Sequence, residues 1–208
     1  MTLWLTRMLV GTCIGSLTAC SKSVQWEEDV PLNTGETIVV KRSGRFNFEC
    51  DIALGTGCGY KPGLGGNGHG VIDFTYRGQK FHFVGDSWMQ LLAISNEGVP
   101  NLVSSAGQWG NSHGYPCVTP YYVQFRPDNT GKHWTWPDRI EPWLYNLPTN
   151  LLIGFAPLDS DGKTIGQSDR EELNRSILSY REFQQIDPTK RPENCVNPKA
   201  YVNRNRDG

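Results

Sequence analysis

The sequence has no excess of charge of either sign, because 20 lysine and arginine residues face 21 aspartate and glutamate residues. Proteins that bind nucleic acid usually carry a strongly basic surface, so this balance argues against a nucleic-acid partner. Long hydrophobic runs are also missing. A membrane-spanning helix needs about 20 mostly apolar residues, and no segment of the chain reaches that length. We therefore expect neither nucleic-acid binding nor a transmembrane helix.

Residues that form turns are plentiful, with 23 glycines and 13 prolines in 208 residues. Between them lie short segments in which apolar and polar residues alternate, as in half-buried β-strands. The fold class we predict is mainly β, with antiparallel hairpins forming a sandwich or a partly open barrel and one C-terminal α-helix. The predicted hairpins pair residues 71–77 with 80–84, 89–95 with 99–104, 121–126 with 133–136, and 151–158 with 163–165, and further strands are expected at 37–41 and 45–49.

The first 20 residues have the order of an export signal: Arg7, an apolar run over residues 8–14, and then small residues before a cysteine. The tetrad Leu17-Thr18-Ala19-Cys20 resembles the lipobox of bacterial lipoproteins. That resemblance implies cleavage before Cys20, lipidation of its thiol, and a membrane partner held through the lipid anchor. Ser21 stands where this family's inner-membrane retention signal would place aspartate, which implies the periplasm-facing side of the outer membrane. An ordinary secretory signal, with Cys20 in a disulfide, is the alternative.

These features predict four regions along the chain. A signal peptide occupies residues 1–19, a polar tether 20–25, a β-rich globular domain 26–187, and a polar tail 188–208. The domain would include a helix over 168–186, in which Ser168 and Glu171 form a capping box and Leu173, Ile177 and Tyr180 recur at helical spacing.

Four cysteines remain once Cys13 and Cys20 are set aside, and an exported protein matures in an oxidising compartment. We prefer the pairs Cys50–Cys58, closing a glycine-rich loop, and Cys117–Cys195, holding the C-terminal tail. Other pairings and four buried thiols are alternatives.

Motifs with catalytic associations are incomplete. Gly85-Asp86-Ser87-Trp88 resembles the nucleophile block of GDSL-type hydrolases, but the sequence contains no Asp-x-x-His to supply the base. Residues 63–68 match G-x-G-x-x-G, yet a strand is expected to follow where a dinucleotide site needs a helix. We therefore predict no cofactor and no enzymatic activity, with a serine hydrolase using Ser87 as the alternative.

The sequence gives equally weak evidence for a metal site and for a functional cluster of acidic residues. The four histidines (His69, His82, His113 and His133) lack the spacing of a metal site, and Asp159-Ser160-Asp161-Gly162 has Lys163 where a calcium loop needs an oxygen ligand. We interpret that tetrad as a turn. Three consecutive acids, Glu27, Glu28 and Asp29, are expected to form a solvated patch near the membrane.

Aromatic residues crowd the middle of the chain. In the strand 121–126 the two faces carry Tyr121, Val123 and Phe125 on one side and Tyr122, Gln124 and Arg126 on the other, so both cannot be exposed. Trp134, Trp136 and Trp143 are candidate ligand-binding residues, because tryptophan on a surface suits glycan stacking or a protein interface. Core packing is the alternative role.

A wider resemblance covers about a fifth of the chain. Segments in 25–42, 119–128 (TPYYVQFRPD) and 141–150 (EPWLYNLPTN) are similar to an uncharacterised group of proteobacterial lipoproteins. The resemblance implies anchoring through Cys20 and brings no activity or catalytic residue. Together these observations predict a lipid-anchored adaptor or inhibitor with an envelope protein as partner, or alternatively a peptidoglycan-binding lipoprotein.

Overall fold

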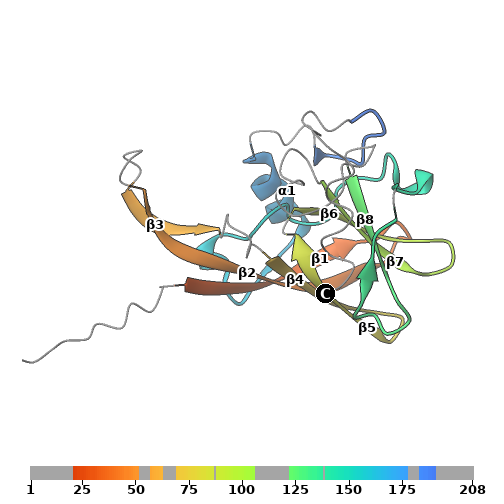
Figure 1. Cartoon of the computed structure of the whole chain (residues 1–208), viewed down its shortest axis with the longest axis horizontal. Coiled ribbons are helices and arrows are strands. Elements are labelled where there is room, and N and C mark those ends of the chain that lie inside the picture. The colour runs from red at the N-terminus through yellow and green to blue at the C-terminus, as the bar shows by residue number, and fades with distance from the viewer. Residues whose placement is uncertain are drawn as a thin grey trace, which may run out of the picture.

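The computed structural model describes residues 21–51, 57–62, 69–86, 88–105, 122–137, 139–177 and 183–190. In this part of the chain the strands form two sheets (Figure 1), so the prediction of a mainly β sandwich with one helix near the C-terminus is confirmed. None of the described helices has the length and apolar character needed to cross a membrane. The elements are β1 (Ser21–Pro31), β2 (Thr37–Asp51), β3 (Gly57–Pro62), β4 (His69–Tyr76), β5 (Gln79–Asp86), β6 (Met89–Ile94), β7 (Pro100–Ser105), β8 (Tyr122–Pro127), β9 (Trp134–Thr135), η1 (Pro142–Leu144), η2 (Leu158–Ser160), β10 (Lys163–Ile165) and α1 (Gln167–Arg175).

The larger sheet has the strand order β10-β1-β2-β4-β5. All of its pairings are antiparallel except that between β1 and β10, which is parallel. Strand β2 is long enough to pair with β4 along one part and with β3 along another. The β2–β3 ribbon therefore projects from the two-sheet body (Figure 1).

The smaller sheet has the order β6-β7-β8-β9, and its inner face packs on the larger sheet. We call the shared interior the central core. Burial of these side chains is the main stabilising contribution, because each large apolar side chain removed from water contributes about 1.5–3 kcal/mol. The central core consists of Val30, Leu32, Val40, Ile72, Phe74, Tyr76, Phe81, Phe83, Met89, Leu92, Ile94, Leu102, Val123, Phe125 and Leu151.

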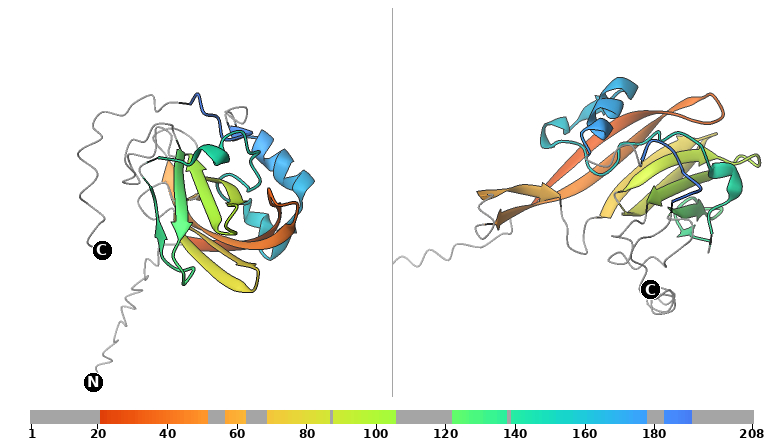
Figure 2. Two further views of the ribbon diagram at one scale, coloured as in Figure 1. Left: turned by 90° about the vertical axis from the view of Figure 1, so that its right-hand side faces the viewer. Right: turned by 90° about the horizontal axis from the view of Figure 1, so that it is seen from above.

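Two smaller cores cover the remaining apolar surfaces. The back core lies on the other face of the smaller sheet and contains Leu91, Ala93, Val103, Tyr122, Ile140, Leu144 and Ile186. The end core lies on the inner face of the larger sheet and contains Val24, Trp26, Phe46, Leu152, Ala156 and Ile165. Helix α1 adds Leu173 to the end core and runs alongside β1 (Figure 2).

Three of the predicted hairpins are confirmed: β4–β5, β6–β7 and β8–β9. Their turns use residues suited to positive φ, such as Gly78 (φ 80°), Gly98 (φ 78°) and Gly131 (φ 72°). In β4 and β5 the alternating residues Ile72, Phe74, Tyr76, Phe81 and Phe83 belong to the central core, whereas His82 faces outward. Local turn chemistry and period-2 alternation were sufficient to predict these hairpins.

The predicted tether is wrong over residues 21–25, which form the first part of β1. Their backbone pairs with residues 43–47 of β2, so this polar segment satisfies its hydrogen bonds in the sheet and not in water. The strands predicted at 37–41 and 45–49 are likewise one continuous strand, β2.

The predicted hairpin between 151–158 and 163–165 is also wrong. Strand β10 instead pairs in parallel with β1, where Gln25 donates its backbone N–H to Asp161 Oδ1 at 2.8 Å and accepts from the N–H of Gly162 at 2.7 Å. Residues 151–153 turn their N–H groups toward β6, Glu28 and Asn174. The tetrad 159–162 is a turn, as predicted, with Gly162 at φ 73°.

The C-terminal helix is shorter than the predicted 168–186 and its N-cap is Gly166, not Ser168. Helix α1 ends at Arg175, where the Ser176 hydroxyl donates to the carbonyl of Leu173 at 2.6 Å. Residues 184–186 are not helical, and their backbone exchanges hydrogen bonds with residues 146–149. Pairing with that distant segment overrides the helical periodicity.

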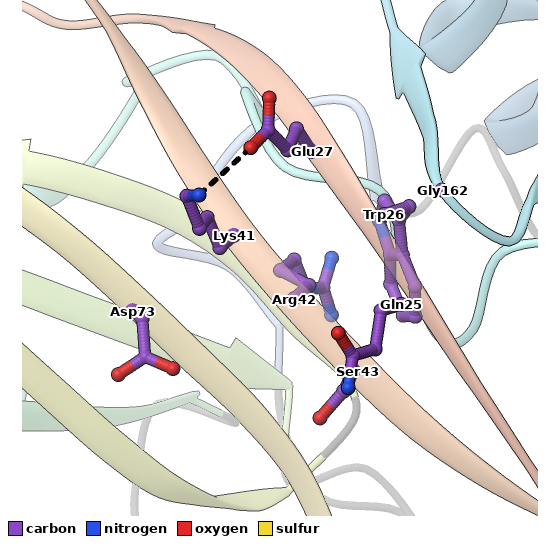
Figure 3. Close-up of a pocket in the computed structure, with 8 residues that line it drawn as sticks. All are labelled: Gln25, Trp26, Glu27, Lys41, Arg42, Ser43, Asp73 and Gly162. Atoms are coloured by element: carbon purple, nitrogen blue, oxygen red, sulfur yellow. Dashed lines mark ion pairs between the residues drawn. The ribbon is translucent and has the colours of Figure 1, made fainter.

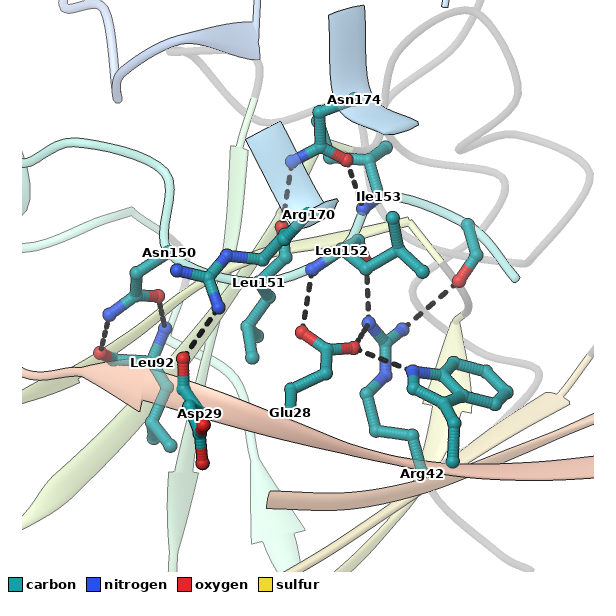
Figure 4. A network of polar contacts seen from close by, with 12 residues as sticks. Glu28, Asp29, Arg42, Leu92, Asn150, Leu151, Leu152, Ile153, Arg170 and Asn174 are labelled. Carbon is teal, nitrogen blue, oxygen red and sulfur yellow. Dashed lines mark hydrogen bonds and ion pairs between the residues drawn. The ribbon is translucent and has the colours of Figure 1, made fainter. Parts of the chain in front are cut away.

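A buried ion pair joins β1, β2 and the segment after Asn150 (Figure 4). Glu28 and Arg42 have side chains 0% and 1% exposed, and Glu28 Oε1 lies 2.8 Å from Arg42 Nη1. Glu28 also accepts from Trp26 Nε1 and from the N–H of Leu152, both at 2.8 Å. Arg42 donates to the carbonyls of Leu152 and Gly154. The expectation of three solvated acids is therefore wrong for Glu28, because strand alternation directs it into the interior.

We predict that Glu28→Ala lowers the free energy of unfolding by about 3–5 kcal/mol, because it leaves the Arg42 charge buried without its partner. The double variant Glu28→Leu with Arg42→Met should lose less unfolding free energy, since both charges are then removed from the interior. The matched control is Glu27→Ala, which breaks an exposed ion pair and should cost less than about 1 kcal/mol. Urea denaturation measures all three variants. Equal losses from Glu28→Ala and Glu27→Ala would contradict this role for the pair.

Candidate outer-face site

The outer face of the larger sheet is the strongest candidate for a functional surface. Successive cross-strand partners in β1, β2, β4 and β5 are Glu27, Lys41, Asp73 and His82. Residues paired in this way share one face of a sheet, so their side chains form a row across four strands. We call these four residues the charged row.

Two close pairs make up the charged row. Lys41 Nζ lies 3.0 Å from Glu27 Oε1, and His82 Nδ1 lies 2.6 Å from Asp73 Oδ1. The side chains of Lys41 and Glu27 are 69% and 41% exposed, and those of His82 and Asp73 are both 49% exposed. Exposed pairs of this kind contribute little to stability. The row is therefore available for contacts outside the chain.

A shallow pocket of about 270 Å³ opens beside the charged row (Figure 3). Polar side chains of Gln25, Glu27, Lys41, Ser43 and Asp73 line it. Two exposed valines lie on either side of the row: Val39, 48% exposed, precedes Lys41 by two residues in β2, and Val84, 55% exposed, follows His82 by two in β5. Alternating charges flanked by apolar side chains suit a protein surface better than a polyanion.

A second pocket, of about 280 Å³, lies where the turns of the three confirmed hairpins meet. The guanidinium of Arg77 stacks 5.2 Å from the centre of the Tyr76 ring at its wall. Asp128 adds a negative charge, since a hydrogen bond from the Thr130 hydroxyl lowers the pKa of its carboxyl. The pocket is lined by Tyr76, Arg77, Gln79, Phe81, Gly98, Val99, Pro100, Pro127, Asp128 and Asn129.

The three candidate tryptophans do not form one platform. Trp134 packs on the central core, 5.4 Å from Phe83 between ring centres, and its Nε1 donates to the carbonyl of His82. Trp136, 38% exposed, lies at the edge of Phe125. Trp143 packs on the back core, across the smaller sheet from the other two. Core packing therefore accounts for most of these rings. Both faces of β8 are buried over residues 122–125, which agrees with the expectation that the two faces cannot both be exposed.

Cys50 and Cys58 form a disulfide between β2 and β3, as predicted. The other candidate residues Cys20, Cys117 and Cys195 lie outside the described residues, as do Ser87 of the hydrolase-like block, His113 and the glycine-rich run 63–68. Among the side chains that the structure describes, no three of histidine, cysteine, aspartate or glutamate gather closely enough to hold a metal ion.

The sequence did not reveal the charged row. Lys41, Asp73 and His82 occupy outward positions of predicted strands, and Glu27 occupies one in the neighbouring strand β1. The missing information was the register between strands, which decides whether Glu27, Lys41 and Asp73 meet. Register over a long strand depends on which face is buried along its whole length. In β1 only three apolar residues, Val24, Trp26 and Val30, indicate which face of the strand is buried.

The fold and this face together define a two-sheet β protein with an open, mixed-charge sheet surface. Comparison with protein-family models, with curated proteins and with solved structures finds no match.

We predict that Trp134→Ala lowers the free energy of unfolding by about 3 kcal/mol, because it removes a ring from the edge of the central core. Trp136→Ala should cost less than about 1 kcal/mol, since that ring is more exposed. Urea denaturation compares the two variants. Equal decreases in unfolding free energy for the two variants would contradict the assignment of Trp134 to the core and Trp136 to the surface.

Proposed function

We propose that this protein is a lipid-anchored binding protein of the bacterial envelope, which holds a protein partner on the outer face of its larger sheet and has no catalytic role. The observation that carries the proposal is the charged row, four exposed ionisable side chains of alternating character in register across four strands. Such an arrangement fixes the orientation of a partner through complementary charges.

The anchor part of the proposal depends on the lipobox-like tetrad that ends at Cys20. Strand β1 begins at Ser21, so only the peptide bond after Cys20 separates the lipidated residue from the folded body. Two or three acyl chains hold a protein stably where one does not, because each buried CH₂ contributes about 0.8 kcal/mol. The body would then sit at the bilayer surface, facing the periplasm from the outer membrane.

We predict that Cys20→Ala abolishes acylation, because the lipid has no other thiol at the cleavage site. Metabolic labelling with a fatty acid should mark the unaltered protein and not the variant, which should remain unprocessed or leave the membrane fraction. Cys50→Ser is the matched control, since it removes a cysteine at a distant position and should keep the label. A labelled Cys20→Ala protein would overturn the anchor.

Binding of a partner at the charged row is tested by exchanging the two members of an ion pair. Glu27→Lys combined with Lys41→Glu keeps the attraction between the two side chains, so stability should change by less than about 1 kcal/mol. The swap reverses the charges presented to a partner, and we expect photocrosslinking from a probe at Val84 to its protein partner in intact cells to fall roughly tenfold or more.

The control for this experiment swaps a different exposed pair, through Asp159→Lys and Lys163→Asp. These side chains are 82% and 59% exposed and lie 3.5 Å apart, and Lys163, two residues before Ile165 of the end core, belongs to the face of the sheet opposite the charged row. The control swap should leave the crosslinked product unchanged. Absence of any defined protein product from position 84, or equal products from both swaps, would contradict binding at the outer face.

A further inference from the structure

An exposed aromatic pair lies on the β2–β3 ribbon. Phe48 and Tyr60 are cross-strand partners, 48% and 40% exposed, with ring centres 5.4 Å apart. Two residues back along β2, Phe46 is buried under Phe155, whose ring centre is 5.7 Å away. The aromatic pair therefore lies on the inner face of the larger sheet, beyond the point where Phe155 covers that face. The two rings are left in contact with solvent.

The ribbon is held together beyond the aromatic pair by the disulfide of the next cross-strand pair, Cys50 and Cys58. A two-stranded ribbon is at best marginally stable alone in water. The disulfide stabilises the pairing without covering the two rings, so they stay exposed on a fixed support. Contiguous exposed apolar surface marks a contact site more often than single exposed residues do.

The aromatic pair lies close to the start of β1, and therefore close to Cys20. Ser21, the first residue of β1, is the cross-strand partner of Asn47, the neighbour of Phe48. Strands lie about 5 Å apart and residues about 3.4 Å apart along them, so the Cα atoms of Ser21 and Phe48 are within about 10 Å. The β2–β3 ribbon and the start of β1 extend from the same side of the body (Figure 1).

Two exposed basic side chains at this end of the sheet suit an anionic bilayer surface. Lys22 and Arg45 are both exposed, and Arg45 Nη2 donates to Ser21 Oγ at 2.9 Å. Over the strand residues 21–24, 44–51 and 57–62 the sequence contains three basic and two acidic residues, a net charge of +1. Basic residues near a membrane surface are attracted to anionic headgroups. Tyrosine is enriched at the level of the headgroups, and phenylalanine is common on the apolar face of segments that lie in the membrane interface.

We infer that the β2–β3 ribbon is a second membrane contact, in which Phe48 and Tyr60 enter the headgroup region of the bilayer that holds Cys20. This inference rests on the proposed lipid anchor. A single point of attachment leaves a protein free to change its tilt over the bilayer, whereas an anchor plus an aromatic contact fixes its orientation. The charged row would then stand at a constant height and angle above the membrane for its partner.

The test places the photoprobe p-benzoylphenylalanine at position 48, 60 or 39 of the full chain in its native membrane. Val39 is the matched control, because it lies in the same strand and has the same 48% exposure as Phe48. It is nine residues further along β2, which corresponds to about 30 Å. After irradiation, phospholipid adducts are quantified by mass spectrometry, and the intact mass of the same sample reports the acyl groups on Cys20.

We expect roughly tenfold more phospholipid adduct from positions 48 and 60 than from 39, since position 39 lies beyond the depth of the headgroup layer. Equal adducts at all three positions, or protein adducts in place of lipid at 48 and 60, overturn the membrane contact while an acylated Cys20 leaves the anchor standing. A sample with no acyl group on Cys20 overturns the anchor itself.

Discussion

The ion pair between Glu28 and Arg42 is the interaction on which the arrangement of the larger sheet depends. Removing both charges from water is costly, and the cost is offset only where hydrogen bonds complete the site. Trp26, Leu152 and the carbonyl of Gly154 supply those bonds. The pair thus ties β1 and β2 to the segment that covers them, far away in the sequence.

Covering the inner face in this way leaves the outer face open. In β1, Trp26 and Glu28 point inward, whereas Glu27 between them points outward and meets Lys41. A shift of one residue in the pairing would exchange the two sets of side chains. Because Arg42 bonds Glu28 inside while Lys41 bonds Glu27 outside, both faces specify the same register. The inner pair supports the fold, and the outer pair is free to serve recognition.

Local signals in the sequence were enough to predict part of this structure. Hairpins such as β4–β5 have a short glycine turn between alternating strands, and the cross-strand disulfide follows from two cysteines eight residues apart. Features that depend on distant segments were not predictable. The burial of Glu28 needs Leu152, the parallel pairing of β10 needs Gln25, and residues 184–186, expected in the helix, pair with residues 146–149. Neither amino-acid composition nor local sequence pattern predicts contacts between such distant segments.

Lysine footprinting tests most directly whether the outer face binds a partner. Lys41 and Lys163 have similar side-chain exposure, 69% and 59%, and each is paired with one carboxylate, but only Lys41 belongs to the charged row. Modification by a lysine-reactive reagent is compared between native envelopes and the purified protein. The account predicts that Lys41 reacts several-fold less in the envelope while Lys163 is unchanged. Equal reactivity of Lys41 in both samples would contradict it.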